Sequence, residues 1–148
     1  MKEFDCLKIE NQLCFPLYAC SKELIKKYTP YLNELDLTYT QYIAMLVMWE
    51  YNEMNVKALG EKLFLDSGTL TPLLKKLEMK NYIKRVKDAN DERNIIVSVT
   101  LKGKELKTRA KSIPGLIGKC LNLDEKEVIN LYTILYKILN GFKADSEN

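Results

Sequence analysis

Apolar residues recur with a helical period along most of this 148-residue chain. The clearest case is the segment 67–79, whose leucines share one helix face by the i, i+3, i+4, i+7 rule: Leu70, Leu73, Leu74 and Leu77. Comparable stripes predict five more helices, over about 10–31, 38–51, 56–64, 101–112 and 124–142. Residues 1–9 lack such a stripe and are expected to form a loose leader.

Residues that cap or break helices set the expected boundaries. The expected caps are Thr38 in a capping box with Gln41, then Asn55, Ser67, Thr100 or a neighbour, and Asp124 paired with Glu127. Pro16 predicts that the first helix either kinks there or begins near Phe15. Pro114-Gly115 is expected to break or bend the helix that follows Thr100. The last helix is expected to bury Val128, Leu131, Leu135, Ile138 and Leu139.

Between the fourth and fifth helices the apolar pattern changes from a helical to a strand period. The runs 82–86 and 94–100 are rich in β-branched residues and are joined by a polar turn, which predicts a β-hairpin. Two short helices followed by a two-stranded wing form a winged helix-turn-helix. We therefore expect one α+β, mainly α domain, with a DNA-binding region over about 38–100 and dimerisation helices over about 10–36 and 104–142.

Composition excludes several classes of protein. The beginning of the chain lacks the features of a signal peptide, and no apolar run reaches the ~20 residues of a membrane span, so we expect a cytoplasmic protein without a membrane partner. The chain contains no histidine, no pair of cysteines in a CxxC motif and no glycine-rich phosphate loop. We expect no metal, no cofactor and no enzymatic activity.

The distribution of charge points to a polyanionic partner. The segment from Asn55 to Lys104 holds 11 Lys/Arg and 6 Asp/Glu, a net charge of +5, whereas the rest of the chain carries −2. Charge alone slightly favours an ordinary solvated surface. The predicted fold favours double-stranded DNA, because a basic wing beside a helix-turn-helix is typical of operator binding.

The outward face of the fourth helix supplies the expected DNA contacts. Short polar groups at its start can reach base edges and lysines further on can neutralise phosphates, while an arginine on the wing can enter a minor groove. The candidate DNA-binding residues are Ser67, Thr69, Thr71, Pro72, Lys75, Lys76, Asp91 and Arg93.

Several stretches resemble the MarR family of dimeric bacterial transcription regulators. "LDSGTLTPLLKKLE" followed by "DERN" matches its general pattern. "ENQLCFPLYACSKELIKKY" and "LDLTYTQYIAMLVMWE" are similar to the branch of organic hydroperoxide resistance regulators (OhrR), with staphylococcal-type global regulators close by. The resemblance covers residues 8 to 142, although Pro16 departs from the pattern of the branch.

The resemblance implies that Cys14 is a peroxide-reactive thiol. In the branch, tyrosines at the positions of Tyr28 and Tyr39 hydrogen-bond the thiolate across the dimer, and one at Tyr18 lies near it. The chemistry agrees, because the thiolate attacks peroxides and, without histidine, phenols and a helix N-terminus are the available stabilisers. The competing interpretation is a buried structural cysteine.

The other cysteines take lesser roles. The resemblance places Cys120 close to the resolving thiol of two-cysteine members, whereas single-cysteine members cap the oxidised thiol with a small cellular thiol. Cys20 lies one and a half helical turns beyond Cys14 and should point away from it, in the core or on the surface. Cys6 lies in the leader.

The main hypothesis is a homodimeric repressor that binds operator DNA when reduced and releases it when organic hydroperoxide oxidises Cys14. A second hypothesis is a MarR-type regulator gated by a small aromatic or lipophilic ligand, or a broader redox-responsive global regulator. A third is a thiol peroxidase, which leaves the basic wing unexplained and lacks a recycling CxxC pair.

Overall fold

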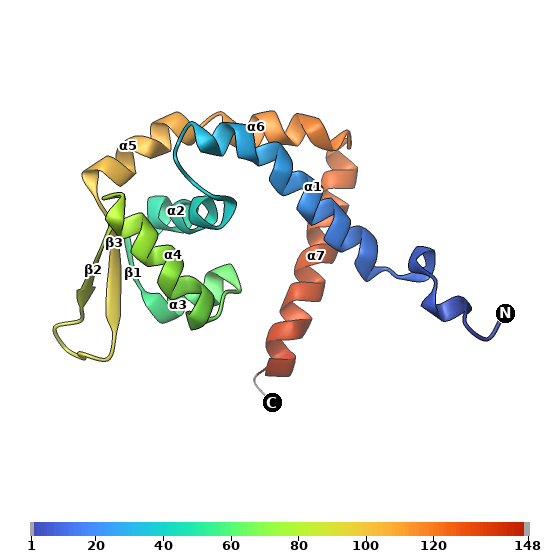
Figure 1. The fold of residues 1–148 in the computed structure, drawn as a ribbon, viewed down its shortest axis with the longest axis horizontal. Coiled ribbons are helices and arrows are strands. Elements are labelled where there is room, and N and C mark those ends of the chain that lie inside the picture. Colours follow the sequence, from blue (N-terminus) through green and yellow to red (C-terminus); the bar gives the residue numbers. More distant parts are fainter. Residues whose placement is uncertain (1, 147–148) are drawn as a thin grey trace. The chain divides into compact units, whose positions relative to one another are not determined.

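The structure is a computed structural model that describes residues 2–146. The chain divides into two compact units, residues 1–113 and 114–148, which are described separately. The first unit holds two short 3-10 helices, five α-helices and a three-stranded sheet (Figure 1). Its elements are η1 (Asp5–Leu7), η2 (Ile9–Asn11), α1 (Cys14–Asn33), α2 (Tyr39–Tyr51), β1 (Glu53–Asn55), α3 (Val56–Leu63), α4 (Ser67–Met79), β2 (Ile83–Lys87), β3 (Ile95–Val99) and α5 (Leu101–Ala110).

The N-terminal segment is more ordered than the sequence indicated. Instead of a loose leader it forms η1 and η2, held by side-chain amides: Asn11 donates to the Asp5 carbonyl at 2.7 Å and Gln12 to the Lys8 carbonyl at 3.2 Å. The first α-helix begins at Cys14, so the second of the two expectations for Pro16 is close to correct. Pro16 is the third residue of α1, where a missing backbone N–H has no helical partner to lose.

Most predicted caps are present. The capping box of Thr38 and Gln41 opens α2, and the side chains of Asn55 and Thr100 accept from backbone N–H groups at the starts of α3 and α5. The prediction for α4 was wrong by one residue. Asp66 is the cap, with Oδ1 accepting from Thr69 N at 2.8 Å, and Ser67 is the first helical residue. This hydrogen bond lowers the pKa of Asp66.

The wing has three strands, not the predicted two. The antiparallel order is β1-β3-β2, with Met54 opposite Val97 and Arg85 opposite the same residue on the other side. The three residues of β1 are too few to show a strand period, so pairing with β3 decides their conformation. The β2–β3 hairpin projects beyond the helices of this unit (Figure 1).

The core of the first unit surrounds α2, which contacts α1, α3, α4, α5 and the sheet. Its buried side chains include Met45 and Met48 of α2, the four leucines of α4, and Leu59 and Val97. Glu78 of α4 is tied to β2 by Arg85, whose Nη2 and Nε lie 2.8 and 3.1 Å from Glu78 Oε2. The Arg85 hydrogen bonds lower the pKa of Glu78.

In the second unit, α6 (Ile113–Gly118), which begins at the last residue of the first unit, leads into η3 (Lys119–Leu121) and α7 (Glu125–Ser146). Pro114-Gly115 does not break a helix as predicted. Pro114 is the second residue of α6, where proline is tolerated, and the interruption lies at residues 111–112. The predicted Asp124–Glu127 pair is present, because Glu127 N donates to Asp124 Oδ1 and Asp124 N to Glu127 Oε2, each at 2.9 Å.

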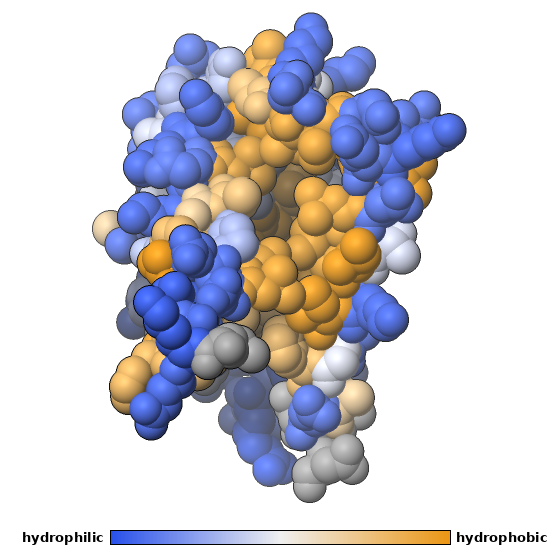
Figure 2. All heavy atoms as spheres, turned by 90° about the vertical axis from the view of Figure 1, so that its right-hand side faces the viewer, coloured by the Kyte–Doolittle hydropathy of each residue, from blue (hydrophilic) through white to orange (hydrophobic). Residues whose placement is uncertain are grey.

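The apolar stripe of α7, which the sequence predicts to be buried at a dimer interface, is not buried within the second unit. Leu135, Ile138 and Leu139 are half-buried, whereas Val128 and Leu131 are exposed at 42% and 43%. Further apolar residues of this helix are also exposed, among them Ile129, Tyr132, Ile134, Tyr136 and Phe142. In Figure 2, residues are coloured by hydropathy, and exposed apolar residues are orange. A helix of 22 residues with so much apolar exposure has a face that its own unit leaves uncovered.

Gly103 of α5 allows the closest approach in the first unit. A Cβ at this position would lie 2.1 Å from the Tyr82 carbonyl oxygen and 2.8 Å from Val99 Cγ2. The Gly103 carbonyl also accepts a 2.8 Å hydrogen bond from the buried indole of Trp49. Only glycine lets α5 approach Tyr82 and Val99 this closely while its carbonyl accepts the hydrogen bond from Trp49 of α2.

Gly103→Ala is therefore expected to destabilise the protein by about 3 kcal/mol, the upper range for overpacking, because the clash is with backbone. Gly115→Ala is the matched control, since a Cβ there meets nothing within 4 Å and alanine favours the helix. Urea denaturation of both variants measures the difference. Equal midpoints for the two variants would show that α5 can shift away at little cost.

Candidate functional site

The outward face of α4 carries six of the predicted DNA-binding residues. The structure leaves all six exposed: Ser67, Thr69, Thr71, Pro72, Lys75 and Lys76. They are exposed because the opposite face holds the leucines, which are at most 6% exposed. The Asp66 cap fixes the first turn of α4, where the short polar side chains lie. This arrangement can offer hydrogen-bond donors and acceptors followed by two cations to a DNA groove.

The turn of the wing presents Arg93 to solvent. Asp91 organises this turn, because its Oδ1 accepts from Arg93 N at 3.1 Å and its backbone carbonyl accepts from Asn94 N at 2.9 Å. The Arg93 side chain is 94% exposed, and its Nε lies 3.5 Å from Asp91 Oδ1. A weak exposed ion pair of this kind orients a guanidinium and contributes little to stability.

One exposed cation on α3, Lys62, is not among the residues that the sequence indicated. Lys62 lies over the ring of Tyr51, 4.5 Å from its centroid, and donates to the Tyr51 hydroxyl at 3.1 Å. The two residues are eleven apart and belong to different helices, so no sequence period could have paired them. Arg85, in contrast, is occupied by Glu78 and is not available to a phosphate.

Cys14 lies at the N-terminal end of α1, and its side chain is exposed. This position places the thiol at the positive end of the helix dipole. Tyr18 follows one turn later and is also exposed, with the ammonium of Lys22 5.6 Å from its ring centroid. In the single chain the thiol is therefore not buried, contrary to what the competing interpretation of a structural cysteine expects.

Tyr28 and Tyr39 lie together, as the resemblance implied, with ring centroids 5.0 Å apart in an edge-to-face arrangement. Tyr42, which the sequence analysis did not select, completes the cluster at 5.7 Å from Tyr28 and 6.3 Å from Tyr39. Burial, with a further contribution from the neighbouring phenols, raises the pKa of Tyr28 to about 12. Burial also raises the pKa of Tyr39 and Tyr42, so all three remain protonated hydrogen-bond donors near neutral pH.

The Tyr28–Tyr39 pair does not meet the thiol of its own chain. Tyr28 follows Cys14 by fourteen residues in the same helix, a separation of about 21 Å at the rise of an α-helix. Hydrogen bonds from these phenols to a Cys14 thiolate therefore need a second copy of the chain.

The remaining cysteines are exposed as well. Cys120 lies in η3 of the second unit, where Sγ is 3.5 Å from the Leu116 carbonyl oxygen to which it donates. Cys20 is on the surface of α1, one of the two places expected for it, and Cys6 lies in η1. Within residues 2–146, no three His, Cys, Asp or Glu side chains are grouped to hold a metal ion, and no helix is long and apolar enough to cross a membrane.

Comparison with known proteins relates this geometry to function. Residues 26–110 match the family model of the transcriptional regulator SarA/Rot. The organic hydroperoxide resistance transcriptional regulator of Bacillus subtilis is 45% identical over 137 residues, 93% of each chain. The chain belongs to the MarR/SarA-type family of transcriptional regulators.

Other members are similarly related. The regulator SarZ of Staphylococcus saprophyticus is 47% identical over 132 residues, which are 89% of this chain and 90% of SarZ. The structure of reduced AbfR bound to DNA has a TM-score of 0.80 and 30% identity, and covers 97% of this chain and 98% of AbfR. A disulfide-formed AbfR has a TM-score of 0.60 at 30% identity, covering 96% and 94%. The predicted winged helix-turn-helix is thereby confirmed.

Arg93→Ala is expected to reduce operator affinity by about 1–3 kcal/mol while leaving the fold intact, because the side chain contacts only the turn. Lys75→Ala and Lys76→Ala should mainly flatten the salt dependence of binding, since each removes one phosphate contact. Fluorescence anisotropy with labelled operator at several salt concentrations measures both effects. Wild-type affinity of Arg93→Ala at moderate salt would remove the wing turn from the DNA interface.

The pKa of Tyr28 makes stability depend on alkaline pH. Since the folded value of about 12 exceeds the ordinary 10.0, the contribution of Tyr28 is complete below pH 10 and is lost as the pH rises towards 12. Tyr28→Phe should therefore weaken the fall in unfolding free energy across this window, measured by urea denaturation at pH 8, 10 and 11. The exposed Tyr18 provides the control, and an identical pH profile for Tyr28→Phe and Tyr18→Phe would contradict the assignment.

Proposed function

We propose that this regulator is a dimeric, cytoplasmic repressor that binds operator DNA when reduced and releases it when organic hydroperoxide oxidises Cys14. The observation that carries the proposal is the exposed Cys14 at the N-terminal end of α1, in a chain 45% identical to an organic hydroperoxide resistance regulator. The tyrosine cluster, the apolar face of α7 and the outward face of α4 each supply one part of the mechanism.

Operator binding is supported by the surface of the first unit. The exposed face of α4 and the projecting Arg93 present the groups that read bases and neutralise phosphates. AbfR, of similar fold, has been solved on DNA. A dimer would place two such surfaces on successive major grooves, about 34 Å apart, so the operator should be pseudo-palindromic.

Dimerisation is supported by the two ends of the chain. The 22-residue α7 leaves apolar side chains such as Ile129 and Ile134 more than half exposed, and α1 exposes Leu17 and Ile25. Covering these faces with a second copy removes apolar surface from water at about 25 cal/mol per Å². We propose residues 10–36 and 104–142 as the dimerisation segments and residues 38–100 as the DNA-binding region.

The proposed chemistry begins with the Cys14 thiolate. It attacks the terminal oxygen of the hydroperoxide, the O–O bond breaks, and the alkoxide leaves and takes a proton to become an alcohol. Cys14 is thereby oxidised to a sulfenic acid. Tyr28 and Tyr39 of the second copy would stabilise the thiolate as donors, and their raised pKa values keep those protons in place at neutral pH.

The sulfenic acid is then resolved by a second thiol, with loss of water and formation of a disulfide. We propose Cys120 of the second copy as this thiol, since it is exposed and follows the short α6. The disulfide-formed structure of AbfR supports such a step in a relative. A disulfide needs Cα atoms within about 7 Å, so forming it would fix the dimer in one arrangement and thus the spacing of the two α4 helices.

Cys14→Ser should bind operator as the wild type does and no longer release it in cumene hydroperoxide, because a serine hydroxyl cannot form a sulfenic acid. Titration of labelled operator before and after stoichiometric peroxide measures this. Cys20→Ser is the matched control on the same helix and should respond normally.

Release of Cys14→Ser by peroxide would reject Cys14 as the sensor. A non-reducing gel of oxidised wild type and Cys120→Ser separates the two routes of resolution. A covalent dimer that is lost in Cys120→Ser supports the proposed disulfide, whereas Cys14 found as a mixed disulfide with a small added thiol makes the protein a one-cysteine sensor.

A further inference from the structure

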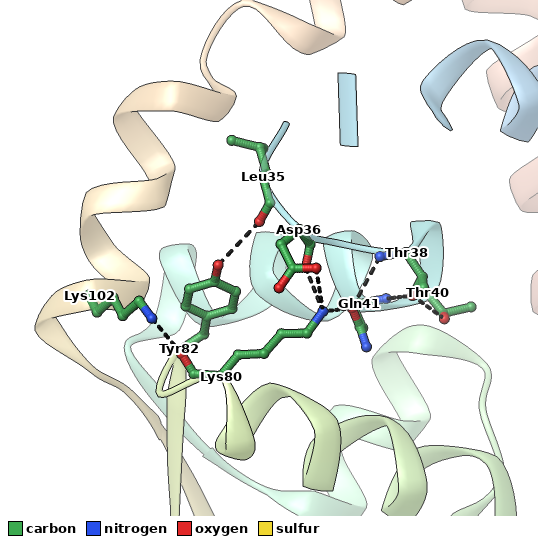
Figure 3. A network of polar contacts seen from close by, with 8 residues as sticks. All are labelled: Leu35, Asp36, Thr38, Thr40, Gln41, Lys80, Tyr82 and Lys102. Atoms are coloured by element: carbon green, nitrogen blue, oxygen red, sulfur yellow. Dashed lines mark hydrogen bonds and ion pairs between the residues drawn. The ribbon is translucent and has the colours of Figure 1, made fainter. Parts of the chain in front are cut away.

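A lysine at the end of α4 is bonded to the turn between α1 and α2. Lys80 is the C-cap of α4, and its ammonium donates to the Asp36 carbonyl oxygen at 2.6 Å and to Gln41 Oε1 at 3.2 Å (Figure 3). It also pairs with Asp36 Oδ1 at 3.3 Å. The Lys80 side chain is only 26% exposed. It therefore points into the protein, unlike Lys75 and Lys76 of the same helix.

The oxygen that Lys80 contacts on Gln41 also belongs to the cap of α2. Gln41 is the one polar residue with a buried side chain among residues 2–146, and its Oε1 accepts from Thr38 N at 3.1 Å as well. Gln41 N in turn donates to Thr38 Oγ1 at 3.3 Å. Tyr39 is the first residue of α2 and lies inside this closed capping box. The position of the Tyr39 ring thus depends on the Gln41 side chain, to which Lys80 donates.

Two further hydrogen bonds attach the same turn to Tyr82 and to α5, and a third attaches α5 to Lys80 itself. Tyr82, which precedes β2, donates from its hydroxyl to the Leu35 carbonyl at 3.2 Å. Lys102 of α5 donates to the Lys80 carbonyl at 3.0 Å and lies 5.2 Å from the Tyr82 ring centroid (Figure 3). Arg109 donates to the Glu34 carbonyl. Residues 34–38 are therefore connected to α5 and to the residue that precedes β2.

These contacts differ from an ordinary surface ion pair. An exposed Lys–Asp pair contributes little, because solvent screens it. Here the ammonium also holds a backbone carbonyl and a buried amide oxygen, and hydrogen bonds from a charged donor to such acceptors are among the stronger ones. A movement of the first turn of α2 would therefore either break these contacts or move Lys80 with it.

We propose that Lys80 is a positioning residue that couples the oxidation state of Cys14 to the orientation of α4. The coupling runs through Gln41 in the first turn of α2, which also carries Tyr39. The inference rests on the proposed function for the sensing step. Oxidation removes the thiolate that accepts from Tyr39 of the other copy, and the α2 turn then adopts a new position. Lys80 transfers that change to the end of α4 without an intermediate side chain other than Gln41.

The test uses Lys80→Met, which keeps an unbranched apolar stem and removes the charge and all three donors. Lys104→Met is the control, since it removes an exposed lysine from α5. Two quantities are measured on the full-length protein: the rate of Cys14 oxidation, by mass spectrometry of the dimedone adduct, and the ratio of operator Kd after and before cumene hydroperoxide.

Lys80→Met should oxidise at the wild-type rate, bind operator when reduced, and show a Kd ratio at least about fivefold smaller than the wild type, the lower end of typical coupling. Lys80→Arg should restore most of the ratio, because a cation with donors returns. A wild-type ratio in Lys80→Met, or a loss of reduced-state affinity with an unchanged ratio, would overturn the coupling role.

Two other outcomes can be distinguished from a failure of the coupling role. If the wild type itself is not released by peroxide, the proposed function fails before any variant is compared. If Lys80→Met does not bind operator when reduced, Asp36→Asn replaces it, since asparagine tolerates the left-handed backbone at this position (φ 53°) and only the carboxylate is lost. Its Kd ratio should fall by less than that of Lys80→Met, and a wild-type ratio would again overturn the role.

Discussion

Burial of one face of α4 is the constraint on which the rest of the DNA-binding unit depends. Leu70, Leu74 and Leu77 are at most 1% exposed, and rotating the helix to present other residues would return them to water. A fully buried leucine contributes about 1.5–3 kcal/mol, so the rotation is fixed by several such contributions. The exposed polar and basic face follows from this packing. The hydrogen bonds from Arg85 to Glu78 and from Lys80 to the α2 turn then fix the end of the helix relative to the wing and to α2.

The sensing groups obey a different constraint, which is distance. Cys14 and Tyr28 lie fourteen residues apart in α1, and a rigid helix keeps them about 21 Å apart in any single chain. The proposed reactive thiol and its proposed donors therefore form one site only if two copies pair. The apolar face that α7 exposes in its own unit favours the proposed pairing for an independent reason, the exposure of its side chains. A dimer satisfies both requirements together.

The contacts of Lys80 connect these two constraints. In the proposed mechanism, a signal produced at the dimer contact has to reach α4, whose orientation is fixed by its buried leucines. The turn at residues 34–38 is bonded to α4, to the residue before β2 and to α5, while Tyr39 in the adjoining cap belongs to the aromatic cluster. A change at the tyrosines and a change at the DNA surface thus involve the same few hydrogen bonds.

The sequence by itself determined the helices, most of their caps and the outward residues of α4, because these depend on periods and hydrogen bonds within a few residues. It also indicated Cys14, Tyr28 and Tyr39, through resemblance and not through spacing; their roles stay predictions. Only the tertiary structure decided that β1 joins the wing, that Asp66 and not Ser67 caps α4, and that Pro114 lies in the first turn of a helix. It alone brought Tyr42 to the cluster, Lys62 to Tyr51 and Lys80 to Asp36. Each of these depends on residues distant in the chain or on a choice between neighbouring caps, and packing, which no local pattern records, makes that choice.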